Sequence, residues 1–373
     1  MAISRRVLPG LAAVSACLGA GAVLAQEDNP FTYSNASGGS VTFYGQFSPS
    51  YLHFDDGEKS YDEAADNNNS NTRLGFDLDQ ELSNGLNLRF KVETALGVPS
   101  TADLDQSGDQ VWDWERTDLR KFEMIMSGAF GAVSLGQGSM ASDGSAQTDL
   151  SKTAIAGYVN RPDLIGGYSL RDSDGNRSDI SWSQVLGDFD GGRRNRIRYD
   201  SPDFSGFSFA IAYGEEILKK DDDAEYYDIG AYYKHTYGVF DMAAGAGYGW
   251  KDGDGGTDEM YAASFSILHT PTGLNGTIAG GGEDGGGSYG YIKLGWIGDL
   301  MPVGYTAFSA DYYSGNDFHS DGSDSESWGL QAVQYFEDIN LEAYLAFSEY
   351  SFDEDGGSYK DASSTLFGVR WKF

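Results

Sequence analysis

Apolar and polar residues alternate along almost the whole chain. This two-residue period is typical of β-strands whose two faces meet different surroundings. It is clearest in residues 71–82, 85–97, 205–215 and 361–373, where one face is apolar and aromatic and the other is small, polar or charged. The 3.6-residue period of helices is absent from these windows, so the pattern predicts an all-β protein.

The alternation predicts sixteen strands with two kinds of connection. Every second connection is a tight turn such as Ser83-Asn84 or Tyr237-Gly238, and the others are longer and rich in Asp, Gly, Ser and Asn, with 139–192 by far the longest. The expected strands are 40–54, 71–82, 85–97, 112–127, 130–138, 193–201, 205–215, 224–236, 239–250, 258–270, 273–282, 287–298, 302–314, 325–336, 339–352 and 361–373.

The apolar face of an up-and-down sheet of sixteen strands can either meet lipid on the outside of a barrel or pack in the core of a soluble protein. In a closed barrel of this size the lumen is too wide for side chains to fill, so the polar face lines water and the apolar face meets lipid. A bilayer does not tolerate open sheet edges, so the sheet must close. The prediction is a 16-stranded antiparallel transmembrane β-barrel, a single domain over 26–373. The alternative is a secreted or lipid-anchored soluble β-protein. A propeller would show a repeat of about 40 residues, and none is seen.

The N-terminus reads as an export signal. Arg5 and Arg6 precede an apolar stretch that ends at Val23-Leu24-Ala25, which predicts a signal peptide over residues 1–25. Two alternatives stay open: a short membrane anchor, and a lipoprotein signal in which Cys17 is lipidated.

Composition narrows the functional class. The formal net charge of −32 disfavours nucleic acid as a partner, and an aromatic content of 14% argues against disorder. The four histidines are scattered, with no HExxH and no G-x-S-x-G elbow, so no enzyme is predicted. The stretch Gly245 to Gly249 lacks the dinucleotide fingerprint.

Several segments resemble the general diffusion porins of Gram-negative bacteria, closest to the alphaproteobacterial type. They are Val41 to Gln46, Thr72 to Phe76, Leu82 to Leu86, Ser127 to Gln137, Ile197 to Phe207 and Gly368 to Phe373. Each is short, but together they are spread over the whole mature chain.

The resemblance implies a water-filled outer-membrane channel for passive diffusion of small hydrophilic solutes and ions. It implies a homotrimer in the lipid bilayer, in contact with lipopolysaccharide, with 139–192 folded into the lumen as a constriction loop. Phe373 would be the terminal residue that the barrel assembly machinery reads. Where the family often has a basic residue, this chain has Gln137. A substrate-specific outer-membrane channel is the alternative function.

Selectivity in such a channel is set where wall charges face loop charges. The alternation directs five basic residues to the lumen: Arg73, Arg89, Lys91, Arg196 and Arg198. The favoured opposing acids in the long loop are Asp149 and Asp163. In the fourth strand the face is undecided between the set with Arg120 and the set with Lys121.

No cofactor is predicted. Acid clusters in the outer loops, among them Asp252 with Asp254, are weak candidates for Ca²⁺ or another divalent cation, because none has the EF-hand spacing.

Overall fold

The computed structural model describes residues 31–220 and 222–373, which form a closed antiparallel barrel of sixteen strands. The predicted signal peptide, residues 1–25 with Cys17, lies outside the described residues. Within the described ranges, no helix combines the length and apolarity needed to cross a membrane. The all-β prediction is confirmed.

The first two barrel strands are each interrupted once, and the other fourteen are continuous. The first eight are β2 with β3 (Gly39–Phe47, Pro49–Asp55), β4 with β5 (Ser60–Asp66, Arg73–Glu81), β6 (Asn87–Ala95), β7 (Leu119–Gly128), β8 (Gly131–Ser139), β11 (Arg193–Asp200), β12 (Phe207–Glu215) and β13 (Glu225–Tyr237). The last eight are β14 (Phe240–Gly253), β15 (Gly256–His269), β16 (Leu274–Glu283), β17 (Ser288–Met301), β18 (Gly304–Asn316), β19 (Asp324–Phe336), β20 (Leu341–Glu354) and β22 (Ala362–Lys372).

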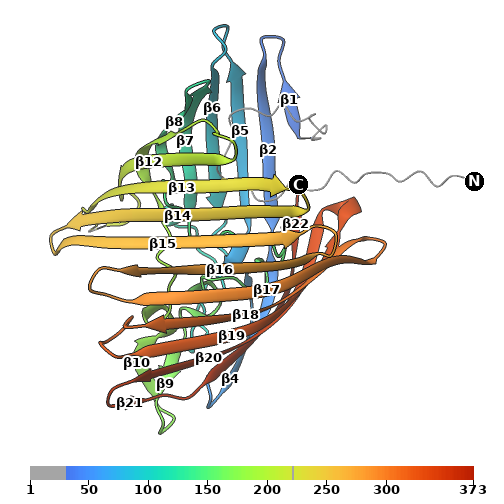
Figure 1. Ribbon diagram of the computed structural model, residues 1–373. Helices are drawn as coiled ribbons and strands as arrows, with labels where there is room; N and C mark the ends of the chain where they lie inside the picture. Colours follow the sequence, from blue (N-terminus) through green and yellow to red (C-terminus); the bar gives the residue numbers. More distant parts are fainter. Residues whose placement is uncertain (1–30, 221) are drawn as a thin grey trace, which may run out of the picture.

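Short elements complete the chain. Strand β1 (Thr32–Ser34) pairs with the start of β2, and β21 (Gly357–Ser358) pairs with the end of β20. The helical turns are η1 (Asn68–Ser70), η2 (Arg116–Asp118), α1 (Pro162–Ile165), η3 (Trp182–Gln184) and η4 (Glu337–Ile339). In Figure 1 strands β13 to β20 cross β2, β5 and β6 at a steep angle, as tilted strands on two walls of a barrel do.

The barrel closes where its last strand meets its first. Strand β22 pairs with β20 on one side and with β2 and β3 on the other. At the end of this seam Phe373 and Gly45 exchange two backbone hydrogen bonds of 3.1 Å each. The Phe373 ring packs against Phe31, Phe47 and Trp371, at centroid distances of 5.4 to 6.0 Å. The terminal residue is therefore part of the closed wall.

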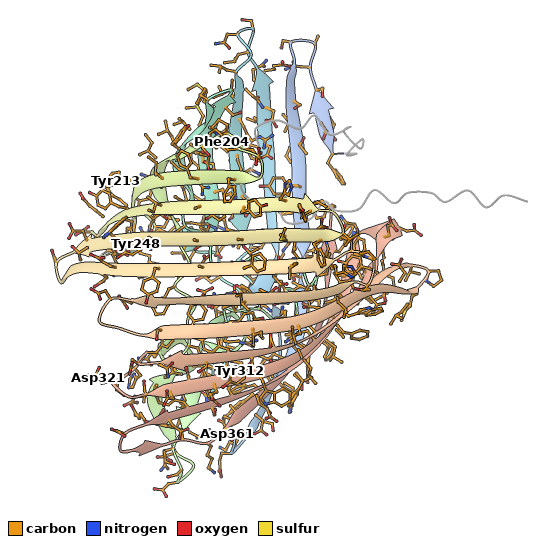
Figure 2. All side chains as sticks on the ribbon, in the orientation of Figure 1. Phe204, Tyr213, Tyr248, Tyr312, Asp321 and Asp361 are labelled. Carbon is orange, nitrogen blue, oxygen red and sulfur yellow. The ribbon has the colours of Figure 1, made fainter. Side chains whose placement is uncertain are left out.

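The outer face of the wall is apolar. Its exposed side chains include Phe43, Leu74, Phe122, Ile197, Phe209, Ile278, Leu294, Leu345 and Phe367. Aromatic pairs lie near both ends of the strands, with Tyr213–Tyr227 and Tyr248–Tyr261 toward the long loops and Phe207–Tyr233 and Trp296–Phe308 toward the turns. Figure 2 shows Tyr213 and Tyr248 near the same end as Asp321, which lies in a loop. This is the apolar band with two aromatic girdles of a membrane-spanning barrel.

Three predicted boundaries are wrong. Residues 55–70 were expected as one loop, but they contain β4, which the asparagine-rich segment 67–71 separates from β5. The expected strand 112–127 begins only at Leu119. Trp112 and Trp114 alternate like strand residues, but their indole N–H groups donate to the Leu96 carbonyl (2.6 Å) and the Thr94 hydroxyl (2.9 Å). The expected loop 251–257 is a tight hairpin, because β14 and β15 pair as far as Gly253 and Gly256.

Residues 140–192, here called the inner loop, pack against the inner face of the wall. The loop contains α1, η3 and a two-stranded sheet of β9 (Ser169–Arg171) and β10 (Arg177–Ser181). Its buried side chains join inward-facing residues of β3, β17, β18 and β20 in one core, which includes Leu164, Ile165, Tyr168, Trp182, Leu186, Phe54, Tyr291, Tyr313 and Tyr350. The polar face of the sheet is thus divided into a part covered by this loop and a part left to water.

Glycines on the inner wall let the loop lie close to the strands. A Cβ atom on Gly230 would come within 2.2 Å of the Ala141 carbonyl oxygen, and one on Gly247 within 2.6 Å of Ser142 and Ser145. The glycine-rich stretch Gly245 to Gly249 therefore lies on β14 as part of the seat for the inner loop.

Candidate functional site

Two buried ion pairs fasten the inner loop to the wall. The Lys293 ammonium group on β17 donates to Asp149 (2.7 Å) and to the Gly157 carbonyl (2.7 Å), and the Arg161 guanidinium donates to Asp311 on β18 (2.7 Å). Lys293, Arg161 and Asp311 have fully buried side chains. Burial opposes ionisation of Asp149, but the Lys293 charge outweighs it and holds the pKa of Asp149 below its usual value.

This geometry corrects the expectation for Asp149. The carboxylate faces β17 and is used by Lys293, so it does not oppose the basic residues across the lumen. Sequence reasoning missed Lys293 and Arg161. A signal was present for Lys293, because it shares the inward face of β17 with Tyr289 and Tyr291, and large side chains on a polar face indicate something packed against them.

Three of the five predicted basic residues lie on the wall of β5 and β6 and remain partly accessible. Arg89 pairs with Asp79 at 2.7 Å and Lys91 with Asp77 at 2.9 Å, both between neighbouring strands. Arg73 is the least tightly paired, with its Nε 3.9 Å from Glu93. For Arg89 and Lys91 a local carboxylate therefore balances the charge.

A β-bulge settles the facing of the fourth strand. Glu93 on β6 is opposite Lys121, but Thr94 is opposite Leu119, so Arg120 is one extra residue in β7. The bulge directs both Arg120 and Lys121 inward, and the Arg120 Nε lies 2.7 Å from Glu93. The expected set with Lys121 faces inward, and the bulge adds Arg120 to it, whereas Phe122, Met124 and Met126 are exposed on the outer face.

Arg196 and Arg198 lie at the root of the inner loop and are buried, each side chain being 3% exposed. Arg196 pairs with Glu123 and donates to the carbonyls of Gly136 and Ser139. Arg198 pairs with Asp200 at 2.6 Å and donates to the Met140 carbonyl. The expectation that these two line the pore is corrected: the protein covers them, and they hold the base of the loop.

A further group of cations lies beside the lumen. We call Arg73, Arg120, Lys121, Arg193 and Arg194 the basic wall; Arg193 and Arg194 were not among the five basic residues predicted from the sequence. Arg120, Arg193 and Arg194 line a cavity of about 350 Å³, here called the wall cavity. Arg194 stacks on the Tyr226 ring, with its guanidinium carbon 4.0 Å from the centroid.

Asp163 is the predicted loop acid that lies near the basic wall. It belongs to α1, accepts hydrogen bonds from Asn68 (2.7 Å) and Tyr158, and feels the charge of Arg193. Burial raises the pKa of Asp163 to about 7; the Asp188 carboxylate adds to this effect, whereas Tyr158, Asn68 and Arg193 oppose it. Asp163 is therefore a loop acid whose charge changes near neutral pH.

The candidate divalent site has no support from geometry. Asp252 accepts a hydrogen bond from Thr257 across its hairpin (3.3 Å), and Asp254 lies in the turn. Among residues 31–220 and 222–373, no three His, Cys, Asp or Glu side chains are grouped to hold a metal ion. Gln137 lies opposite Asn195 and Phe122 and is buried.

Comparison with known families decides the class. A family model described as Gram-negative porin matches residues 10–355. The chain belongs to the Gram-negative porin family. This porin is therefore an outer-membrane channel through which small hydrophilic solutes and ions diffuse passively. A search of the curated proteins found no match.

Solved structures of similar shape are outer-membrane channels and proteins. An anion-selective porin from Comamonas acidovorans shares 17% identity, with 90% of this chain and 100% of that chain covered and a TM-score of 0.60. OmpT of Vibrio cholerae in a trimer form shares 15% identity over 90% and 99%, with a TM-score of 0.55. The channel DcaP of Acinetobacter baumannii shares 11% identity over 91% and 99%, with a TM-score of 0.57. At these identities the likeness is one of fold.

Proposed function

We propose that this porin prefers anions and that the basic wall sets the preference. The observation that carries the proposal is the division of charge in the lumen. The pairs at Arg89, Lys91 and Arg196 each contain their own carboxylate. Within residues 31–220 and 222–373, the five cations of the basic wall share two ion-pair partners, Glu93 and Glu216. The basic wall itself therefore carries more positive charge than its ion-pair partners offset, while Asp66, Asp103 and Asp118 line the cavity beside it.

The acidic excess of the whole chain argues in the opposite direction. A net charge of −32 makes the mouths of the channel negative, which favours cations at the entrance. Charges more than about 8–10 Å away are largely screened at physiological ionic strength. An ion in the lumen therefore responds mainly to the wall beside it, and the anion-selective relative has the same fold.

The experiment is the reversal potential of single channels in a KCl gradient, with Arg120 and Lys121 both changed to glutamine. A unit charge about 7 Å from an ion in water contributes about 0.6 kcal/mol, or about threefold in occupancy. We expect the ratio of anion to cation permeability to fall by about threefold or more. The matched control is Lys251→Gln, which removes a cation from an outer hairpin. A cation-selective wild type, or an unchanged ratio in the double variant, would contradict the proposal.

The finer expectations belong to the same proposal. We infer that the porin is a homotrimer, is not an enzyme and needs no cofactor. We also infer that Phe373 is read by the barrel assembly machinery, and that lipopolysaccharide surrounds the outer rim. The relative observed as a trimer supports the first inference. Conductance that appears in steps of three in planar bilayers would test it, and single independent steps would contradict it.

A further inference from the structure

Among the described residues that line the wall cavity, Arg193 is the cation on a strand that the protein itself does not use. Arg193 forms no hydrogen bond through its side chain and no ion pair with any residue in 31–220 or 222–373, and its Nε is buried without a partner. Its neighbours are engaged, since Arg120 binds Glu93 and Arg194 donates to the Arg193 carbonyl (2.7 Å). The buried Nε is closed to solutes, whereas the two terminal nitrogens keep accessible surface on a residue that lines the cavity. Arg193 is therefore available to a solute.

The carboxylates that also line the cavity are occupied by donors of their own loops. Asp66 accepts from the Thr72 backbone (2.6 Å) and hydroxyl (2.7 Å). Asp103 accepts from Ser100, Asp118 from the Glu115 backbone, and Glu216 from the Leu218 backbone. These four carboxylates thus help to hold the rim of the cavity in shape, whereas the guanidinium of Arg193 has no such structural contact.

The size and lining of the cavity indicate the class of solute. A volume of about 350 Å³ lies in the range of small-molecule sites and exceeds what a chloride ion needs. Apolar side chains share the lining with the cations: Ala95, Val98, Leu119 and Leu218. Lys219, from the loop after β12, is a further cation of the lining and does not belong to the strand wall. An anionic group with a small apolar body fits this mixture better than an inorganic anion.

We propose that the wall cavity binds small organic carboxylates in transit, with Arg193 as the contact for the carboxylate. This rests on the proposed anion preference, which it deepens by naming the solute class. The guanidinium fork matches a carboxylate in two parallel hydrogen bonds, so the site recognises shape as well as charge. A solute that stops there during passage obstructs the current, so the site produces saturable block.

The test is single-channel recording in KCl with benzoate added on one side. We expect a concentration-dependent, saturable block by benzoate, and no comparable block by inorganic phosphate or by the neutral analogue benzyl alcohol. Arg193→Gln should weaken the block by benzoate about tenfold or more, since a charge-assisted hydrogen bond is lost. Arg193→Lys should weaken it less, because the charge is kept and only the fork is lost. Lys251→Gln changes the net charge by the same amount, and benzoate should block this variant as strongly as it blocks the wild type.

The outcomes separate this proposal from the general function. A channel that conducts KCl but shows no saturable block by benzoate overturns the carboxylate site and leaves the pore intact. Equal block by phosphate overturns the solute class, and equal block by benzylammonium assigns the site to the lining acids instead of Arg193. Loss of KCl conductance in the wild type would contradict the channel itself. If Arg193→Gln fails to assemble, the comparison of the four solutes on the wild type decides the proposal.

Discussion

Replacing Lys293 with methionine tests whether the buried ion pairs keep the inner loop against the wall. The Lys293 ammonium is fully buried, and it contacts Asp149, the Gly157 carbonyl and the Thr153 hydroxyl at 2.7, 2.7 and 3.3 Å. Methionine keeps most of the volume but removes all three donors. Asp149, which is itself buried, is left as an unpaired charge.

The magnitude follows from burial. Breaking a buried ion pair by removing one partner typically costs about 3–5 kcal/mol. If this free energy is lost from the contact between the inner loop and the wall, the equilibrium shifts toward the displaced loop. The shift is about two to three powers of ten, since about 1.4 kcal/mol is tenfold. A displaced loop moves into the open part of the lumen. We therefore expect frequent brief closures and higher current noise in single-channel recordings of Lys293→Met.

Two further variants make the result specific. In Lys293→Met combined with Asp149→Leu no charge is left unpaired, and replacing a buried pair by apolar groups is often neutral, so the current should be quieter than in the single variant. Lys251→Met breaks an exposed pair with Asp258 worth about 0–1 kcal/mol and should leave the recordings unchanged. A Lys293→Met channel as quiet as the wild type, or a double variant noisier than the single one, would refute the reasoning.

Three further changes test the remaining charges. Glu93→Gln removes the carboxylate that lies 2.7 Å from Arg120. We expect the ratio of anion to cation permeability, measured from the reversal potential, to rise by about threefold. An unchanged ratio would contradict the basic wall as a selectivity element. Arg196→Gln leaves Glu123 buried without its cation, so thermal or urea unfolding should show a loss of about 3–5 kcal/mol, with less change in selectivity than Glu93→Gln. Asp163, with a pKa of about 7, loses its charge as pH falls, so anion preference should be higher at pH 5 than at pH 8. Asp163→Asn should abolish that pH dependence, and its persistence would place the titrating group elsewhere.

Much of the fold could be predicted because the two faces of each strand have different solvents. From β13 to β20 the predicted strands fall within a few residues of the observed ones, although the β14–β15 connection is tighter than expected and the turn after β17 is shifted to 302–303. The errors have local causes. Strand β4 was lost because the asparagines of 67–71 read as a loop, although Asn67 is buried and its side chain donates to the Ile155 carbonyl (2.8 Å). Period alone cannot distinguish a short interruption inside a strand from a connection between strands.

The facing of charges was predictable only where alternation is unbroken. It placed Arg73, Arg89 and Lys91 on the face opposite the exposed apolar side chains of the wall, where they lie beside Glu93, Asp79 and Asp77. At Arg120 the bulge inserts one residue, and no residue type in that stretch announces it. A rule with a period of two has no means to detect a change of phase of one residue.

Alternation shows which side chains lie on the inner face of the barrel. It does not show which of these are exposed to water and which are covered by the inner loop. Arg196 and Arg198 are on the inner face, yet they lie under the inner loop. The path of this loop, which spans residues 140–192 between β8 and β11, is set by tertiary packing and not by the strand period. The size of the inward side chains distinguishes a covered part of the inner face from an exposed one. Where the inner face carries large aromatic side chains, as on β17 and β20, something must pack against them. Where it carries only small or charged residues, as on β5 and β6, it can face water. Reading the size of inward residues strand by strand therefore indicates which wall holds the loop and, by elimination, which cations reach the solute.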